Sequence, residues 1–161
     1  MGIECVVVAF LKHEGQYLLI KRSPDKKHFP NVWDGVGGGV EKDEFQTPDK
    51  AILREIYEET GLKRNDVSGL TLRYVHVKRI DDFLCYHYVY FGEASKNDVW
   101  QTDEGVLYWV SEKELFERTY SPTMEQLLRH YFSSGRNTPD LYLFSTYQGV
   151  DTITPFETEN Y

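Results

Sequence analysis

The N-terminal part of the chain alternates short apolar runs with polar turns. Residues 3–11 (IECVVVAFL) are almost continuously apolar and rich in valine, which is typical of a strand buried on both faces. A turn at 14–15 precedes a second apolar run at 17–20, and residues 22–31 form a polar loop with two prolines. Residues 32–40 hold four glycines, which suits a strand whose backbone is closely approached. The pattern therefore predicts a series of strands before residue 41.

The signals for a helix are strongest between residues 47 and 61. Thr47 is a good N-cap and Pro48 a good first helical residue, because the N–H that proline lacks would be unpaired there. Gly61 is typical of the residue that follows a helix. A later helix is predicted after Ser121-Pro122, where apolar residues recur at helical spacing. Its apolar positions are Met124, Leu127, Leu128 and Tyr131.

Further strands are predicted at 69–79, 83–92 and 106–110. The segment 83–92 has bulky residues on both faces, which favours a central strand that is covered on each side. Strands interleaved with helices predict an α/β fold with a mixed sheet, with an α+β arrangement as the alternative. After a linker, the tail over 141–156 is predicted to form a hairpin around Gln148-Gly149.

Composition restricts the class of protein and its partners. A chain of 161 residues is the size of one domain, and its formal net charge of −8 argues against binding a polymeric nucleic acid, which needs a basic surface. A small anionic ligand would need local positive charge. The longest apolar run, at 5–11, is too short to span a membrane, and the first four residues carry no basic leader. Cys5 and Cys85 are interpreted as reduced thiols of a cytoplasmic protein.

Three glutamates share one face of the first predicted helix. Glu55, Glu58 and Glu59 are spaced i, i+3, i+4, and Arg54 lies four residues before Glu58. Like charges at this spacing repel, and negative charge near a helix C-terminus opposes the helix dipole. A divalent cation would offset that cost, and an all-oxygen cluster suits Mg²⁺ or Mn²⁺. The alternative for this string alone is a solvated acidic face.

A glycine-rich segment precedes the helix. Gly37-Gly38-Gly39 leads into an acidic loop, and glycines there let the main chain approach a phosphate or a metal. Together with the helix, this segment resembles the box of the Nudix hydrolase family, G-x5-E-x7-R-E-U-x-E-E-x-G-U, in which U is a bulky aliphatic residue. The matching residues are Gly38, Glu44, Arg54, Glu55, Ile56, Glu58, Glu59, Gly61 and Leu62. The one departure is the interval 45–53, nine residues where the family pattern has seven, and it leaves the position of Glu44 open.

The resemblance implies a fold, a reaction and a set of ligands. It implies a Nudix domain over 1–135, an α/β/α sandwich with a mixed, curved β-sheet flanked by helices. Residues 136–161 would be a C-terminal extension, either a hairpin or a dimerisation arm. The implied reaction is metal-dependent hydrolysis of a nucleoside diphosphate linked to another group, X. The implied metal ligands, with Mg²⁺ as the cofactor or Mn²⁺ in its place, are Glu55, Glu58, Glu59 and the Gly37 carbonyl. Catalytic roles fall to Glu55 as candidate base, Glu58, and Arg54, which would orient the carboxylates.

Residues outside the helix are expected to complete the site. Glu104, in TDEGVLYWVS, is a further candidate catalytic carboxylate or a solvated loop residue. Arg22 could receive a polyphosphate or be plain surface charge. Asp34 lies in WDGVGG, which is similar to the WNGFGG segment of oxidised-purine nucleoside triphosphatases, where an Asn reads the base. A carboxylate can still accept from a purine N–H. Gly38 completes the expected substrate-binding set.

The identity of X is the least determined part of the sequence interpretation. The first hypothesis is a nucleoside triphosphate, including an oxidised one, converted to the monophosphate and pyrophosphate. Residues 18–23 (LLIKRS) resemble a motif of coenzyme A pyrophosphatases, and 22–34 (RSPDKKHFPNVWD) resembles a segment of isopentenyl diphosphate isomerases and their hydrolase-like relatives. The sequence also leaves open a sugar-nucleotide substrate, and a Nudix-fold sensor that binds a nucleotide without turnover. The expected partner is a small-molecule nucleotide, without a membrane, and a homodimer is one possible state of assembly.

Overall fold

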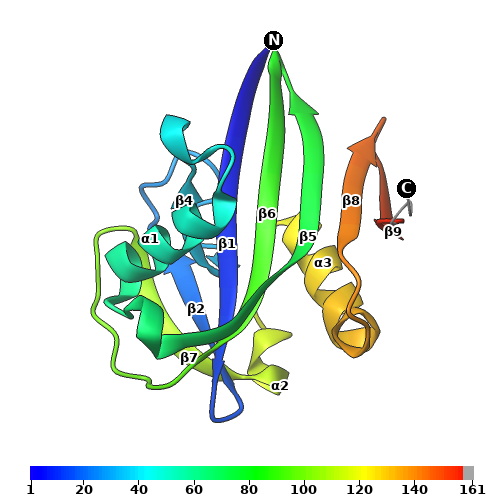
Figure 1. Ribbon diagram of the computed structural model, residues 1–161. Helices are drawn as coiled ribbons and strands as arrows, with labels where there is room; N and C mark the ends of the chain where they lie inside the picture. Colours follow the sequence, from blue (N-terminus) through cyan, green and yellow to red (C-terminus); the bar gives the residue numbers. More distant parts are fainter. Residues whose placement is uncertain (158–161) are drawn as a thin grey trace.

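Two long parallel strands form the middle of the sheet. In the computed structural model, which describes residues 1–157, β1 (Gly2–His13) and β6 (Phe83–Ala94) pair along almost their whole length (Figure 1). β6 lies between β1 and β5 (Val67–Ile80), which confirms the prediction of a central strand. The adjacent residues Tyr90 and Phe91 point to opposite faces of β6 and both are buried, because the sheet is covered on each side there.

The sheet is mixed, and its strands follow the order β3-β2-β1-β6-β5-β8-β9. The β1–β6 and β5–β8 pairs are parallel, and the other pairs are antiparallel. In addition, β4 pairs with the middle of β1, residues 6–9, and β7 pairs with β2. The remaining strands are β2 (Gln16–Arg22), β3 (Trp33–Asp34), β4 (Val36–Gly39), β7 (Gly105–Ser111), β8 (Tyr142–Tyr147) and β9 (Val150–Pro155).

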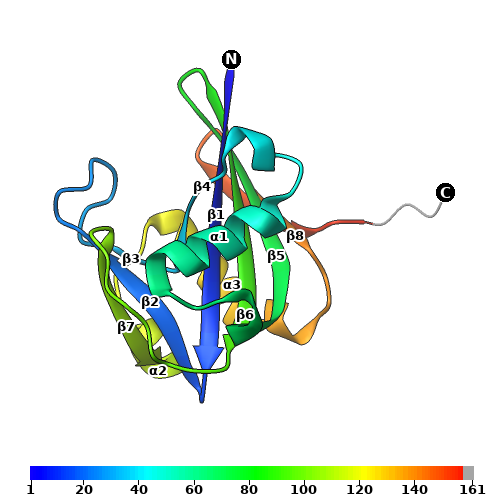
Figure 2. The same ribbon diagram turned by 60° about the vertical axis from the view of Figure 1, so that its left-hand side comes forward.

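Helices cover both faces of the sheet, so the α/β/α sandwich is confirmed (Figure 2). α1 (Pro48–Thr60) lies on one face, and α2 (Glu112–Leu115) and α3 (Pro122–Ser133) lie on the other. Alternate residues of β1 divide the core in two. Val7, Ala9 and Leu11 pack in the cluster that contains Ile52 and Ile56 of α1, whereas Val8 and Phe10 pack in the cluster that contains Leu127 and Leu128 of α3. Short 3₁₀ turns occur at η1 (Lys42–Glu44), η2 (Arg64–Asp66) and η3 (Gly135–Asn137).

The segment 32–40 differs from its prediction as one strand, because it changes partner at Gly35. Residues before Gly35 pair with β2 as β3, and residues after it pair with β1 as β4. A Cβ at Gly35 would lie 2.5 Å from the carbonyl oxygen of Ala9. The chain therefore crosses between neighbouring strands where a side chain would collide with the backbone of β1.

The C-terminal segment forms a hairpin that extends the same sheet. β8 and β9 pair around Gln148-Gly149, and β8 runs parallel to β5 (Figure 1). The division of the chain at residue 135 stays a prediction, because this hairpin shares its sheet with the strands before it. Within residues 1–157, Cys5 and Cys85 are free thiols. None of the helices in this part of the chain is long and apolar enough to cross a membrane.

Candidate active site

Helix α1 ends at the predicted residue, and Trp100 packs against that end. Gly61 has a φ of 76°, in the left-handed region that glycine adopts without strain. A Cβ at Gly61 would lie 2.8 Å from the indole ring of Trp100. The indole N–H donates to the carbonyl of Glu58 at 3.2 Å, and the backbone N–H of Trp100 donates to that of Thr60 at 3.0 Å. Trp100 therefore fixes the loop before β7 beside the last turn of α1.

The glutamates of α1 line one cleft together with the glycines of β4. The cleft has a volume of about 360 Å³. It is lined by Gly37, Gly38, Gly39, Glu55, Glu58, Glu59, Thr102 and Glu104. All four residues predicted as metal ligands thus lie together, and Glu104 joins them from the loop before β7. No sequence signal singled out Thr102, which is an unremarkable loop residue in the chain.

Arg54 connects the carboxylates around this cleft. Its Nε and Nη2 donate to the two oxygens of Glu44 at 2.9 and 2.8 Å. Its Nη1 donates to Glu55 at 2.7 Å and to Glu58 at 3.2 Å, and Nη2 also donates to the carbonyl of Gly39 at 3.0 Å. The hydrogen bond from Arg54 lowers the pKa of Glu44, and the bond to Glu44 raises the pKa of Arg54. Glu44 therefore reaches Arg54 despite the two extra residues in the loop between them.

Glu59 is the most enclosed carboxylate of the cleft, only 6% exposed. Its Oε2 accepts the backbone N–H of Gly37 at 2.8 Å. Burial raises the pKa of Glu59 to about 8, and the charges of Glu55 and Glu104 raise it further, whereas the Gly37 hydrogen bond lowers it. Burial also raises the pKa of Glu55, against the hydrogen bond from Arg54. The surroundings of Glu55 and Glu59 therefore favour the binding of a proton or a cation by these carboxylates.

The glycines of β4 leave space that side chains would fill. A Cβ at Gly38 would lie 2.6 Å from the carboxyl carbon and from one oxygen of Glu55. A Cβ at Gly37 would overlap the carbonyl oxygen of Val7 on β1. At Gly39, by contrast, no atom of the described chain lies within 4 Å of that position. Close approach therefore requires glycine at 37 and 38, which agrees with the reason for expecting a glycine-rich strand here.

A second cavity adjoins the cleft at Thr102. It has a volume of about 360 Å³ and lies between the loop after β2 and the start of β7. Arg22 lines it, with its Nη2 donating to the carbonyl of His28 at 3.2 Å and its Nε buried without a partner in the described chain. Lys26, from the same loop, contacts the carboxylate of Glu104. The 23–32 loop is therefore tied to the mouth of the carboxylate cleft, a contact that local sequence could not indicate.

Asp34 lines neither of these two cavities. Its Oδ1 accepts the N–H of Gly35 at 2.8 Å. Burial raises the pKa of Asp34 to about 6, although the Gly35 hydrogen bond and the charge of Arg22 both lower it. The geometry therefore adds no support for Asp34 as a reader of the base, and that role stays a prediction.

Comparison with known proteins assigns the family. The sequence model of the NUDIX domain matches residues 3–131, which run from β1 into α3. The chain belongs to the Nudix family of pyrophosphohydrolases. It is 30% identical to a protein named nucleoside triphosphatase NudI from Salmonella agona over 119 residues, 68% of this chain and 83% of that protein. It is 43% identical to the protein of the same name from Klebsiella pneumoniae over 58 residues, 36% of this chain and 40% of that protein.

Solved structures agree on the fold. A MutT protein from Bacillus halodurans superimposes with a TM-score of 0.70 at 17% identity, covering 94% of this chain and 97% of that one. A Nudix hydrolase from Nitrosomonas europaea gives a TM-score of 0.70 at 18% identity, and the match covers 89% of this chain and 78% of that one. At such identities the likeness concerns the fold alone, and it confirms the expected Nudix architecture.

The donor set of this Nudix cleft fits a hard divalent cation in its chemistry. Glu55, Glu58 and Glu59 offer carboxylate oxygens, and glycines opposite them leave room for an ion. As the side chains lie, no three His, Cys, Asp or Glu residues between positions 1 and 157 form a group that could hold a metal. Two of the glutamates turn toward Arg54 and the third toward the N–H of Gly37. Ligation would therefore require these carboxylates to exchange their present partners for the ion.

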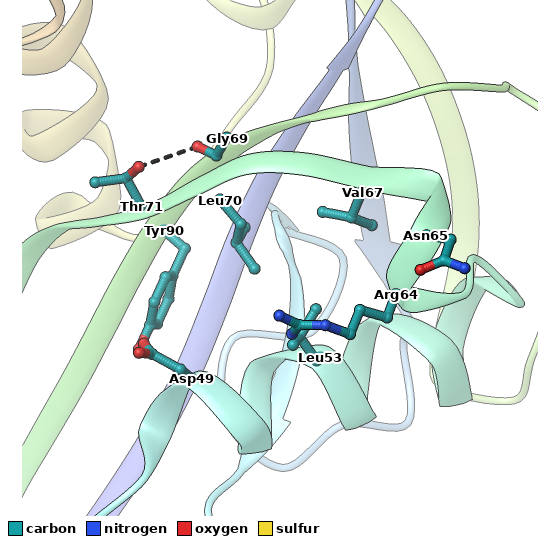
Figure 3. A pocket seen from close by; sticks show the side chains of 9 residues that line it. All are labelled: Asp49, Leu53, Arg64, Asn65, Val67, Gly69, Leu70, Thr71 and Tyr90. Carbon is teal, nitrogen blue, oxygen red and sulfur yellow. Dashed lines mark hydrogen bonds between the residues drawn. The ribbon is translucent and has the colours of Figure 1, made fainter.

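A larger cavity lies on another flank of the Nudix helix and lacks this chemistry (Figure 3). Its volume is about 530 Å³, and Leu53 of α1 and Arg64 of η2 extend into it (Figure 3). Asp49 is the one carboxylate among its lining residues in the described chain, and it accepts the hydroxyl of Tyr90 at 2.7 Å. If volume alone were the criterion for the active site, this cavity would be chosen, although it has no carboxylate cluster. The carboxylate cluster identifies the smaller cleft as the candidate active site.

Proposed function

We propose that this Nudix protein hydrolyses a nucleoside triphosphate to the monophosphate and pyrophosphate, with Mg²⁺ or Mn²⁺ as cofactor. The observation that carries the proposal is the convergence of Glu55, Glu58 and Glu59 on one cleft beside a second cavity that contains Arg22. The relatives named nucleoside triphosphatase support this class of substrate over other X groups.

The carboxylates of the cleft would hold the cofactor, with the Gly37 carbonyl as a further ligand. A divalent cation bound there neutralises phosphate oxygens and lowers the pKa of the attacking water. Glu55 is our candidate for the base, because it lines the cleft and burial raises its pKa above the usual value. Arg54 acts as a positioning residue, since it donates to Glu55 and Glu58 while Glu44 holds its guanidinium.

The second cavity would receive the rest of the nucleotide. Lys21 and Arg22 supply the positive charge that a polyphosphate needs beside an acidic cleft. Asn31 and Tyr108 line the same cavity and offer an amide and an aromatic ring to a base. Thr102 borders both cavities, so a substrate could extend from one to the other past this residue. Glu104 would enter the reaction once Lys26 releases its carboxylate.

The test combines a substrate panel with isosteric variants. Ribo- and deoxyribonucleoside triphosphates, oxidised triphosphates, sugar-nucleotides and coenzyme A are each incubated with Mg²⁺, and the products are identified by ³¹P NMR. We expect monophosphate and pyrophosphate from at least one triphosphate. Glu55→Gln and Glu59→Gln should each lower kcat/KM by at least about 100-fold, because each removes a ligand charge. Glu117→Gln, at an exposed position just after α2 and outside the residues that line the cleft, is the matched control.

Metal removal provides an independent arm. Excess EDTA should abolish turnover, and Mg²⁺ or Mn²⁺ should restore it in the wild type but not in the Glu59→Gln variant. If both glutamine variants keep the wild-type rate, the cleft is not the site of hydrolysis and the proposal fails. If the wild type binds a nucleotide tightly and releases no product with either metal, the protein is a nucleotide sensor.

A further inference from the structure

A basic groove crosses the face of the sheet opposite the Nudix helix. We use this name for the cavity of about 310 Å³ that is lined by Lys12, Tyr17, Arg73, Glu93, Tyr131 and Arg136. Tyr17 packs edge-on against Phe132 of α3, which assigns the groove to the α3 face. Three cations and one carboxylate line it, in a chain whose formal net charge is −8. Positive charge is therefore concentrated here against the trend of the whole molecule.

Arg73 is a buried cation without a carboxylate partner. It is 9% exposed, and its Nε and Nη2 donate to the carbonyls of Asp140, Gly135 and Thr138. In residues 1–157 it makes no ion pair, its Nη1 has no protein acceptor, and its guanidinium carbon lies 5.7 Å from the centre of the Tyr131 ring. The Arg73 side chain also lines the basic groove. Since buried charges are normally paired with an opposite charge, this guanidinium lacks an anion.

Two tyrosine hydroxyls add uncharged donors to the same groove. Neither Tyr17 nor Tyr131 donates or accepts a hydrogen bond through its hydroxyl within the described chain, and both residues line the groove. Burial raises the pKa of Tyr17 to about 12 and also raises that of Tyr131, so both hydroxyls keep their protons at neutral pH. The charge of Arg136 acts on both hydroxyls, as expected for groups that face the same space.

We propose that the basic groove binds a phosphoryl-bearing anion, either a free phosphate or pyrophosphate or the phosphate end of a nucleotide. Guanidinium, ammonium and hydroxyl groups offer several donors from different directions, which matches a tetrahedral group with several charged oxygens. A metal cation is excluded by the same charges. Glu93 lines the groove, and Glu112 forms an ion pair with Arg136 at 3.0 Å. Both carboxylates compete with the anion for the cations of the groove and keep its binding reversible.

Binding of inorganic pyrophosphate by the full chain tests this site. Titration calorimetry is done in EDTA, so that the metal-dependent cleft does not contribute. The variant Lys12→Gln/Arg136→Gln removes two exposed cations of the groove, and Lys50→Gln/Arg129→Gln is the matched control. Arg129, like Arg136, is an exposed arginine paired with a glutamate, so the two double variants lose the same charge. We expect about tenfold or greater loss of affinity in the groove variant and none in the control.

Two further measurements give the position of the bound anion and distinguish a free phosphate from a nucleotide. In ¹⁵N–¹H spectra, pyrophosphate should shift the amide signals of Lys12 and Gly92 and leave those of Gly37 and Gly38 in place, a readout that needs no variant. Tighter binding of AMP than of pyrophosphate, lost in the groove variant, would identify a nucleotide as the ligand, and the reverse order a free phosphate. The proposal is overturned if neither ligand binds at millimolar concentration, or if the groove variant binds as the wild type does. Hydrolysis should be equal in both double variants, so failure here leaves the proposed function untouched.

Discussion

Replacing Gly38 by alanine is the most direct perturbation of the candidate active site. The added Cβ would lie 2.6 Å from the carboxyl carbon and one oxygen of Glu55. Atoms in favourable contact lie about 3.5 Å apart, so the carboxylate has to move by about 1 Å. That displacement is large enough to break the 2.7 Å hydrogen bond between Glu55 and Arg54.

The magnitude follows from what misplacement of a reacting group costs. A displacement of about 1 Å lowers rates by about 100-fold, which corresponds to about 2.7 kcal/mol in the activation barrier. Stability should change little, because Gly38 does not have a positive φ. A glycine-to-alanine change at such a site stabilises the fold by up to about 1 kcal/mol through the unfolded chain, which partly offsets the local collision. The expected variant is therefore folded and nearly inactive.

The neighbouring Gly39→Ala variant is the matched control. At Gly39 no atom of the described chain lies within 4 Å of the new Cβ, so the same chemical change adds no collision. Steady-state kcat/KM with the best triphosphate of the substrate panel, and urea unfolding of both variants, separate activity from stability. Equal activity of Gly38→Ala and Gly39→Ala would refute the reasoning, because it would mean that the position of the Glu55 carboxylate does not matter.

Two further predictions concern stability. Burial lowers the pKa of His76 to about 4, so as pH falls from 6.5 towards 4 the unfolded chain takes up a proton that the folded chain does not. The free energy of unfolding should fall over that window by up to about 3 kcal/mol, and urea unfolding at pH 7.5 and 5 should show a smaller fall in His76→Gln than in the exposed control His28→Gln. Gly61→Ala should lower the unfolding free energy by more than Gly15→Ala. Both glycines have a positive φ, costing about 1 kcal/mol, but only at Gly61 would the Cβ meet Trp100, so equal losses would contradict this account.

The Nudix helix could be predicted to the residue because its signals are local. Pro48 is its first residue and Gly61 follows its last, as predicted, whereas the side chain of Thr47 makes no capping hydrogen bond. The common face of the glutamates follows from helical spacing alone. The sequence could not decide where Glu44 lies, because the short segment 45–47 that connects it to the helix carries no pattern that fixes its conformation. In the structure the long side chain of Arg54 reaches Glu44, and its Nη2 donates to Oε2 of that carboxylate at 2.8 Å.

The rest of the candidate site depends on contacts between distant segments. The break at Gly35 arises because β3 and β4 pair with different strands, and a strand's own sequence does not specify its neighbour. Thr102 lies at the cleft because Trp100 holds its loop against α1. Lys26 lies at the mouth of the cleft because the loop after β2 brings it into contact with Glu104. None of these residues carries a pattern of its own. Local sequence patterns therefore predicted that the carboxylates share one face of the helix. The residues that surround them are brought there by the sheet topology, which local patterns do not specify.

The distribution of charge links the two anion sites that we propose. At a net charge of −8 the molecule repels a polyphosphate at a distance, and at physiological salt that repulsion is screened beyond about 8 Å. Attraction must therefore come from cations that touch the ligand, such as Arg22 in the second cavity and Arg73 in the basic groove. Arg73 is buried and its Nη1 has no protein acceptor in the described chain, whereas Arg22 is half-buried and its Nε, which also lacks an acceptor there, is covered by the protein. A buried arginine with an unused donor, such as Arg73, is prepared for an anion at little cost in side-chain entropy, so an anion site can be selective without making the whole surface basic.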